Sequence, residues 1–283
     1  MTLRIEPTGA TLGAIVSGIR LAELTEQEAS RILDAFHEHA VLVFPGQHLT
    51  AAQQVEFARR FGDIDQLVPG LDSVRVSNQR PDGSLMDDSE EVMQVLRGNE
   101  GWHTDSSYMP VSARASVLSA HLLPAVGGET EWADMRAAYD ALNQRLKERI
   151  EGLSALHSLY YSQERVGHVG KPGTSYGFHG GDPPLRPLVK AHPVTGRRAL
   201  YLGRHAYGIP GLSEAESEAL LVELLTFACQ APRTYLHPWQ PGDVAIWDNR
   251  CVLHRARPYD HREPRFLLHT RIAGDPATES GTG

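Results

Sequence analysis

Cysteines and long apolar runs are scarce in this sequence, and their scarcity narrows the class of protein. Cys229 and Cys251 are the only cysteines among 283 residues, too few for a disulfide framework and typical of a reducing compartment. No apolar run reaches membrane-spanning length, and residues 1–7 lack the basic and apolar regions of a signal peptide. We therefore expect a cytoplasmic protein without a membrane partner.

Basic clusters are missing as well. The net charge is −8, and no run of Lys and Arg forms the stripe that phosphate binding requires, so nucleic acid is not an expected partner. The chain is 41% hydrophobic and 22% charged, the ordinary mix of a globular protein. Because no linker or internal repeat divides it, we expect residues 1–283 to form one domain.

Strand patterns occupy much of the chain, and capped helices interrupt them. Thr25, Thr50 and Ser213 resemble helix N-caps, and a further helix is predicted from about Asp134 through Leu146. Apolar runs and turn residues predict strands at 40–44, 113–123, 244–247, 250–254 and 266–272. The pattern indicates a mainly β protein with flanking helices.

Two segments are expected to lie outside this framework. Residues 66–100 contain Pro81-Asp82-Gly83 and an acidic run and show little periodicity. We interpret them as a long loop, either a lid over a site or a disordered surface insertion. Residues 275–283 are rich in small and polar residues and are predicted to be a disordered tail.

The central candidate for chemistry is the His-X-Asp pair formed by His103 and Asp105. In an extended segment these side chains share one face, so they can converge on one ligand. Imidazole and carboxylate suit a divalent iron that keeps open positions, provided that a second histidine joins them. Trp102 and Tyr108 flank the pair with apolar bulk, whereas the similar 261–263 triplet lies among charges and is interpreted as a solvated loop.

The second histidine is expected at His254, which follows the strand and turn pattern of 246–253. A jelly roll brings strands that are distant in sequence together at its mouth, where such ligands can meet. We therefore predict a double-stranded β-helix, the jelly-roll barrel of cupin-like proteins, with helices around it.

The last predicted strand carries an unusual polar face. Arg265, Leu267, His269 and Arg271 alternate with apolar neighbours and so point to one side. Such a face either meets solvent, the commoner arrangement, or lines a cavity that holds an anion. Arg265 could bind a carboxylate through two parallel hydrogen bonds.

Several longer motifs occur in one order along the chain. They are Leu-Val-Phe-Pro-Gly at 42–46, Trp-His-Thr-Asp at 102–105, Gly-Gly-Glu-Thr-Glu-Trp at 127–132, His-Pro-Val-Thr-Gly-Arg at 192–197, Ile-Trp-Asp-Asn-Arg at 246–250 with His254, and Arg265 with Ile272 and Gly274-Asp275. Together they resemble the taurine and 2,4-dichlorophenoxyacetate dioxygenases over nearly the whole chain. That family uses Fe(II), 2-oxoglutarate and O2.

The resemblance implies a role for each matching residue. His103, Asp105 and His254 would bind Fe(II), while Arg265 and Thr130 would hold the distal carboxylate of 2-oxoglutarate. The family oxidises a substrate carbon while 2-oxoglutarate becomes succinate and carbon dioxide. Members are expected to form even-numbered homo-oligomers, dimers or tetramers.

The resemblance constrains the substrate less. In taurine dioxygenase-like members, an arginine four residues after the oxoglutarate arginine binds the acid group of the substrate, and His269 stands there instead. Asn99 matches a substrate-side position of the family. The alternative residues to bind an acid group are Arg204, His205 and Arg271. We expect a small sulfonate, aryloxyalkanoate or amino-acid derivative, which is cleaved if the hydroxylated carbon carries a heteroatom.

Two other functional classes fit the same residues. A non-catalytic, cupin-like barrel could hold a metal with these ligands and perform no turnover. A zinc hydrolase is also open, because two histidines and one carboxylate suit zinc as well as iron. Dependence on oxygen and 2-oxoglutarate separates both alternatives from an oxygenase.

Overall fold

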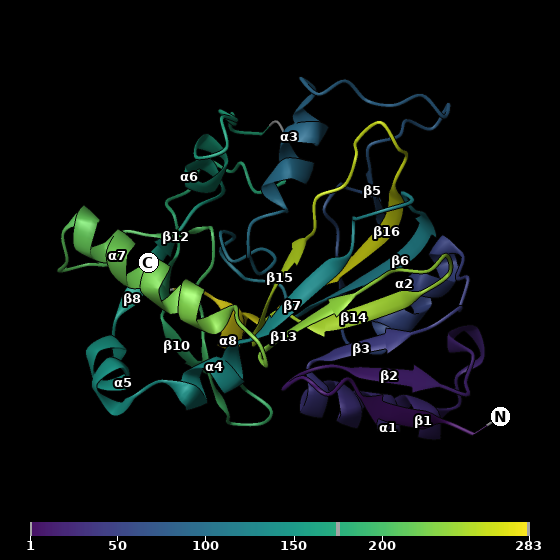
Figure 1. Cartoon of the computed structure of the whole chain (residues 1–283), viewed down its shortest axis with the longest axis horizontal. Coiled ribbons are helices and arrows are strands. Elements are labelled where there is room, and N and C mark those ends of the chain that lie inside the picture. The colour runs from purple at the N-terminus through teal and green to yellow at the C-terminus, as the bar shows by residue number, and fades with distance from the viewer. Residues whose placement is uncertain (1, 174–175, 282–283) are drawn as a thin grey trace.

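A large mixed sheet is the main element of the computed structural model, which describes residues 2–173 and 176–281. Its strands run in the order β1-β2-β3-β14-β6-β16-β4, with β5 also paired to β16 (Figure 1). Neighbouring strands are antiparallel except β2 and β3. The strands are β1 (Arg4–Pro7), β2 (Ala14–Ser17), β3 (Val41–Phe44), β4 (Ile64–Asp65), β5 (Val74–Ser77), β6 (Ala115–Leu122), β14 (Val244–Asp248) and β16 (Phe266–Ile272).

A smaller antiparallel sheet packs against one face of the large sheet. It consists of β13 (Thr234–His237), β7 (Thr130–Asp134) and β15 (Val252–Ala256), in that order. Its buried Trp132 contacts Trp247 of β14, with the ring centroids 5.8 Å apart. Both tryptophans belong to a shared apolar core that also includes Leu253 and Leu267. The two sheets therefore bury one common interior.

Two capped helices cover the opposite face of the large sheet. Helix α1 (Glu26–His39) and helix α2 (Ala51–Arg59) begin after Thr25 and Thr50, and both N-caps form the predicted capping box. Phe36 and Phe57 are buried with inward residues of β2, β3, β6 and β14. Because each face of the sheet is covered, β3 and β14 contribute apolar residues to the core on both sides.

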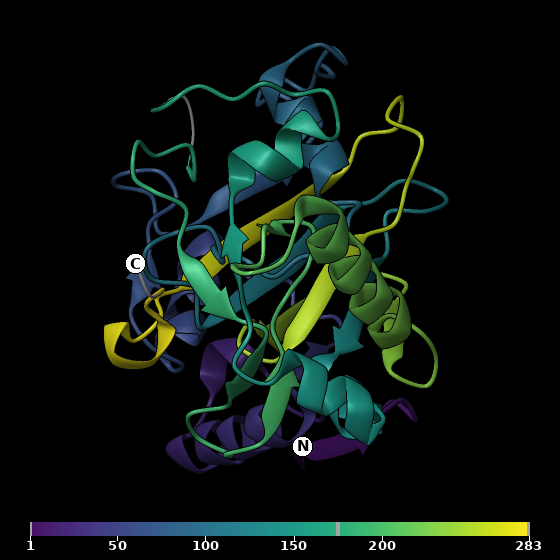
Figure 2. The same ribbon diagram turned by 90° about the vertical axis from the view of Figure 1, so that its left-hand side faces the viewer.

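Most of the remaining elements lie in a helix-rich part that faces the viewer in Figure 2, whereas the 3-10 turn η1 contacts α2. A three-stranded sheet of order β12-β8-β9 and a β10-β11 hairpin belong to this part. The elements not yet given are the 3-10 turn η1 (Leu21–Glu23), α3 (Glu91–Gly98), α4 (Met135–Ala141), α5 (Gln144–Ile150), β8 (Ser154–His157), α6 (Leu159–Glu164), β9 (Leu185–Pro187), β10 (Val189–Ala191), β11 (Arg198–Leu200), β12 (Ala206–Tyr207), α7 (Glu214–Ala228) and α8 (Pro276–Glu279).

The structure corrects two predictions about segments expected to be irregular. Residues 66–100 are not a continuous loop, because they contain β5, which extends the large sheet beside β16, and helix α3. The tail from 275 is ordered through its described residues, since Asp275 caps α8, Pro276 begins it and Glu279 is buried. The sequence did not predict β5, α3 or α8, because neither segment shows a long periodic pattern of apolar residues.

The helix predicted from Asp134 through Leu146 is also wrong as a single element. It ends at Ala141, and Asn143 caps a separate helix by accepting a hydrogen bond from the Leu146 amide. Asparagine competes well as an N-cap and poorly within a helix, which explains the break. Ser213 caps α7 as predicted.

No helix among the described residues has the length and apolar character needed to cross a membrane.

A buried glutamine joins α2 to the large sheet and yields a stability prediction. Gln54 donates to the Leu268 carbonyl and to the Thr270 hydroxyl, both at 3.0 Å, and is fully buried. Replacing Gln54 with Leu leaves those acceptors unpaired and should cost about 2 to 3 kcal/mol of unfolding free energy in urea titrations. The exposed neighbour Glu56→Gln is the control and should change the unfolding free energy little.

Candidate active site

The site residues of the large sheet lie side by side on three neighbouring strands. Ser116 of β6 is directly opposite Trp247 of β14 on one side and Arg271 of β16 on the other. Residues directly opposite in a sheet point to the same face, which here is the interior between the two sheets. His269 of β16 and Arg265, directly before this strand, share the face with Arg271, and all three are at most 7% exposed. The solvent-facing interpretation of this polar strand face is therefore wrong.

The three predicted metal ligands come together. The backbones of His103 and His254 form an antiparallel bridge, with N···O distances of 3.0 and 2.7 Å. Their ring centroids are 4.2 Å apart. Asp105 completes the group, and one ligand atom from each residue lies within 4.8 Å of the other two. All three side chains are buried.

Both imidazoles are suited to bind a cation as neutral rings. The Nδ1 of His103 is 2.7 Å from the Gly101 carbonyl oxygen, which can only accept, so the proton is on Nδ1 and Nε2 keeps its lone pair. Burial lowers the pKa of His103 to about 3 and that of His254 to about 4. Each of the two rings therefore keeps an unprotonated nitrogen that is available as a ligand near neutral pH.

The carboxylate of Asp105 is fixed by two neighbours. Arg271 Nη2 donates to Oδ1 at 3.0 Å, and the Ser116 hydroxyl donates to Oδ2 at 2.6 Å. Burial alone would raise the pKa of Asp105, but Arg271 and the nearby histidines outweigh this effect and hold the pKa well below its ordinary value. The carboxylate is thus ionised and oriented without a metal.

The sequence did not identify Ser116 as part of this site. Its hydroxyl accepts from Asn249 Nδ2 at 3.0 Å, and Asn249 Oδ1 accepts from Trp247 Nε1 at 2.9 Å. A chain of hydrogen bonds therefore runs from Trp247 to Asp105. Asn249 had a visible signal, because it belongs to the Ile-Trp-Asp-Asn-Arg motif, but Ser116 lies in an ordinary apolar strand.

Two imidazole nitrogens and one carboxylate oxygen form the donor set of a facial triad, which suits Fe(II) with open positions. The ligand atoms of Asp105 and His254 face each other, because Asp105 Oδ2 lies 3.8 Å from His254 Nε2. The neutral ligands and the ionised carboxylate need no proton loss to accept the ion. The residues present therefore fit the metal.

A second polar patch in the same cavity suits a carboxylate. Arg265 Nε and Nη2 both donate to the Gly128 carbonyl, at 3.2 and 2.9 Å, which fixes the guanidinium plane. A Cβ on residue 128 would lie 2.9 Å from Arg265 Nε, so only glycine leaves room. Burial lowers the pKa of Arg265 to about 10, and an anion would offset that cost. Thr130 lines the same cavity and accepts from Trp239.

The other predicted site residues also line this cavity of about 750 Å3. Asn99 ends α3, and its carbonyl accepts from the Ala256 amide, two residues beyond His254. His269 Nε2 lies 3.9 Å from Asp105 Oδ2. Arg271, by contrast, already binds Asp105 and Ser106 through its terminal nitrogens. It therefore fixes the metal ligand rather than offering a free anion site.

Arg204 reaches the cavity from the segment after β11. Its Nη2 donates to the Ser162 carbonyl at 2.7 Å, and burial lowers its pKa to about 10. A Cβ on Gly98 would lie 2.4 Å from Arg204 Nη1, so the end of α3 is shaped around this guanidinium. His205 lies beside it and contacts the ring of Tyr108, with centroids 4.8 Å apart.

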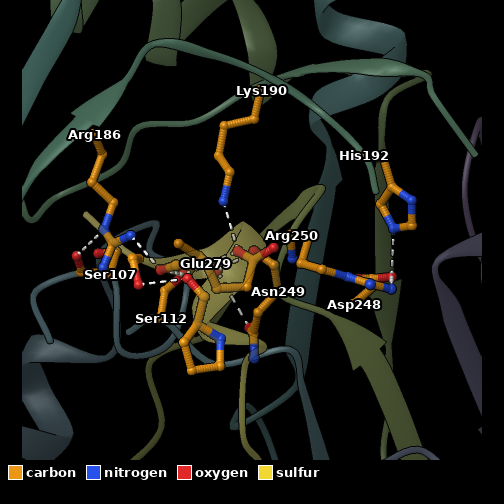
Figure 3. A network of polar contacts seen from close by, with 12 residues as sticks. Ser107, Ser112, Arg186, Lys190, His192, Asp248, Asn249, Arg250 and Glu279 are labelled. Carbon is orange, nitrogen blue, oxygen red and sulfur yellow. Dashed lines mark hydrogen bonds and ion pairs between the residues drawn. The ribbon is translucent and has the colours of Figure 1, made fainter. Parts of the chain in front are cut away.

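A second group with metal-binding residue types lies apart from this cavity and is already saturated. His192, Asp248 and Cys251 are close together, but the Asp248 carboxylate binds Arg250 through both oxygens and His192 through one (Figure 3). Burial raises the pKa of Cys251 well above its ordinary value, which disfavours the thiolate that metals bind. The group is a structural network.

The role of Ser116 can be tested without turnover. Ser116→Ala removes the hydrogen bond to Asp105 Oδ2, and we expect Mn(II) affinity to fall by about 10-fold or more in an EPR titration of free Mn(II). Ser119→Ala is the matched control, since this buried serine on the same strand contacts Gln54 on the opposite face. Equal Mn(II) affinities for the two variants would contradict a role for Ser116 in holding Asp105.

Comparisons with known proteins agree with this geometry. The chain is 53% identical over 282 residues to an (S)-phenoxypropionate/alpha-ketoglutarate-dioxygenase of Sphingobium herbicidovorans, covering 98% of this chain and 96% of that protein. It is 39% identical over 288 residues to an alpha-ketoglutarate-dependent 2,4-dichlorophenoxyacetate dioxygenase of Cupriavidus pinatubonensis, covering 97% and 99%. The solved structure of AAD-2 with Mn(II) and N-oxalylglycine superimposes with a TM-score of 0.91 at 38% identity, covering all of both chains.

A family model agrees with these individual proteins. The model described as taurine catabolism dioxygenase TauD, TfdA family, matches residues 4–271, which confirms the resemblance predicted from the motifs. The iron oxygenase is thereby favoured over the binding barrel and the zinc hydrolase. This chain belongs to the TauD/TfdA family and is an alpha-ketoglutarate-dependent dioxygenase that uses Fe(II), 2-oxoglutarate and O2.

Proposed function

We propose that this enzyme oxidises an (S)-2-aryloxyalkanoate, such as a phenoxypropionate, and thereby releases a phenol. The observation that carries the proposal is the 53% identity, over 98% of the chain, to a dioxygenase named for (S)-phenoxypropionate. The cavity supports it chemically, because a half-buried cationic group, Arg204, and an apolar wall line the same cavity as the metal ligands. Taurine and other alkylsulfonates lack an aryl group that could pack against such a wall.

The co-substrate and metal would occupy the polar part of the cavity. His103, Asp105 and His254 hold the iron, and Arg265 with Thr130 binds the distal carboxylate of 2-oxoglutarate. When bound, iron and 2-oxoglutarate together activate O2 and convert a substrate C–H bond to C–OH, with release of succinate and carbon dioxide. The protein orients the reactants and excludes water around this chemistry.

Arg204 is the residue we assign to the substrate carboxylate. Its half-buried guanidinium lines the cavity and, among the described residues, donates from Nη2 to the Ser162 carbonyl, so other donors remain for an anion. His269 occupies the place of the family's acid-binding arginine, and burial lowers its pKa to about 4, which leaves the ring neutral. The acid group of the substrate is therefore held at Arg204 and away from β16. This position turns a different side of the substrate's α-carbon toward the metal ligands.

An apolar wall supports an aryl ring. It is formed by β5 and α3 together with the segment before β5, and includes Val68, Val74, Val76, Val92, Val95 and Leu96. Val68 is 46% exposed and Val92 44% exposed, although they line a cavity. We infer that this wall, within the segment predicted as a lid, loses solvent exposure when an aryl substrate binds.

Product release follows from the hydroxylated carbon and needs no further cofactor. That carbon carries both the new hydroxyl and the aryloxy oxygen. Its hydroxyl proton is lost as the carbon–oxygen bond to the aryl group breaks, leaving a 2-oxo acid, and the phenolate that departs takes up a proton. A phenoxypropionate would give phenol and pyruvate.

We also propose an architecture, a location and an assembly state for this chain. The large sheet and the β13-β7-β15 sheet, which share one core and the His103–His254 bridge, would be the two halves of a double-stranded β-helix. We propose a cytoplasmic homo-oligomer, a dimer or tetramer, that acts on small molecules. The acidic net charge of −8 supports the absence of a nucleic-acid partner.

Succinate release tests the substrate class. We expect release in the presence of (S)-2-phenoxypropionate, together with an equal amount of phenol. The (R) enantiomer, taurine and an alkylsulfonate should give less than about a tenth of that rate, because they lack the matching acid position or aryl group. Faster turnover of taurine than of every aryloxyalkanoate would contradict the proposal.

Substitutions of Arg204 and Arg265 should change different KM values. Arg204→Met should raise the KM for the aryloxyalkanoate by about 100-fold and the KM for 2-oxoglutarate by less than about threefold. Arg265→Met should show the reverse pattern, because its guanidinium faces the co-substrate. His269→Arg, measured beside them, should lower turnover of the (S) substrate by creating a second acid site. Equal effects of both Met variants on both KM values would contradict these assignments.

A further inference from the structure

A second arginine holds the turn that follows Asp105. Arg186 of β9 is 1% exposed, and its guanidinium donates to four backbone carbonyls: Nε to Ser107 at 2.7 Å, Nη1 to Glu279 at 2.7 Å, and Nη2 to Met109 at 2.6 Å and to Pro110 at 3.4 Å. A guanidinium presents its donors in one rigid plane. These carbonyls must therefore keep fixed positions relative to one another.

Glu279 brings the last described helix of the chain, α8, to the same point. Its carbonyl also accepts from the Ser112 amide at 3.0 Å. Its carboxylate accepts from Lys190 Nζ at 2.6 Å and from the Ser112 hydroxyl at 3.2 Å (Figure 3). The Lys190 and Glu279 side chains are only 11% and 1% exposed, so removing either partner would leave a buried, uncompensated charge.

The backbone between the metal ligand and these contacts has little freedom. Ser106 adopts a φ of +57°, a left-handed conformation uncommon for serine, and its carbonyl accepts from the Met109 amide at 2.9 Å. Arg271 binds the Asp105 carboxylate and the Ser106 hydroxyl, whereas Arg186 binds the Ser107 carbonyl. Two arginines from different strands thus hold three consecutive residues.

We propose that Arg186, Lys190, Ser112 and Glu279 form a clasp that positions Asp105 for metal binding. The inference rests on the proposed role of Asp105 as an iron ligand. Arg186 is a positioning residue, since its contacts are to backbone carbonyls and its influence passes through the Ser107 peptide. The segment predicted to be a disordered tail thereby contributes to the metal site.

The clasp also connects the two halves of the site. Helix α8 continues through residues 273–275 from β16, which carries Arg271 and directly follows Arg265. Its contacts with Arg186 and Ser112 then tie that strand to the turn after Asp105. The spacing between the co-substrate arginine and the metal ligand is consequently set by the C-terminal helix as well as by sheet pairing.

The test measures metal binding apart from turnover. Arg186→Lys keeps the charge but cannot reach all four carbonyls at once, and Glu279→Gln keeps the backbone carbonyl but removes the buried ion pair. The apparent Mn(II) Kd would be obtained from the rise in Tm with Mn(II) and N-oxalylglycine, relative to each variant's own metal-free Tm. Arg198→Lys, the same substitution at an exposed position of β11, is the control.

We expect the Mn(II) Kd to rise about fivefold or more in Arg186→Lys and about threefold in Glu279→Gln, with no change in Arg198→Lys. If Arg186→Lys does not fold, the Mn(II) Kd of Glu279→Gln alone decides whether the clasp positions Asp105. A folded variant with a lower metal-free Tm but the wild-type Mn(II) Kd would show a purely structural role and overturn the clasp. A wild-type protein that does not respond to Mn(II) would instead overturn the ligand assignment and the inference with it.

Discussion

The buried ion pair between Asp105 and Arg271 is the interaction on which the site depends. Both side chains are at most 10% exposed, and the guanidinium 3.0 Å away is the main group that keeps the carboxylate charged despite burial. A buried pair of this kind contributes little net stability, but losing one partner is costly. The pair also fixes the direction of the carboxylate, with Ser116 holding its second oxygen. The protein therefore buries a charged group at an energetic cost, and in return the metal ligand is oriented before metal binds.

Sheet pairing explains how residues far apart in sequence meet at this point. The β6 strand places Ser116 between Trp247 and Arg271, and the bridge between His103 and His254 joins the ligand turn to the smaller sheet. Each of these side chains points inward because strand residues alternate. A one-residue shift of register would turn these side chains away from the cavity, so the site forms only with the observed strand pairing.

Much of this arrangement could be predicted from the sequence, for identifiable reasons. The His103–Asp105 pair and the capping boxes at Thr25 and Thr50 are local patterns, and His254 and Arg265 follow from longer motifs. Ser116 and Arg186 could not be found, since their roles depend on which strands become neighbours. The polar face of β16 was ambiguous because alternation gives the shared face but not whether another sheet covers it. The order of the tail likewise depends on Lys190, a distant partner.

The most direct test of this account is spectroscopic and needs no substrate. Under anaerobic conditions, Fe(II) and 2-oxoglutarate added to the wild-type enzyme should produce the weak visible charge-transfer band of a chelated 2-oxo acid. Asp105→Ala and His254→Ala should each lose the band while their far-UV circular dichroism stays native. A band of unchanged intensity and position in either variant would contradict the three-residue iron site.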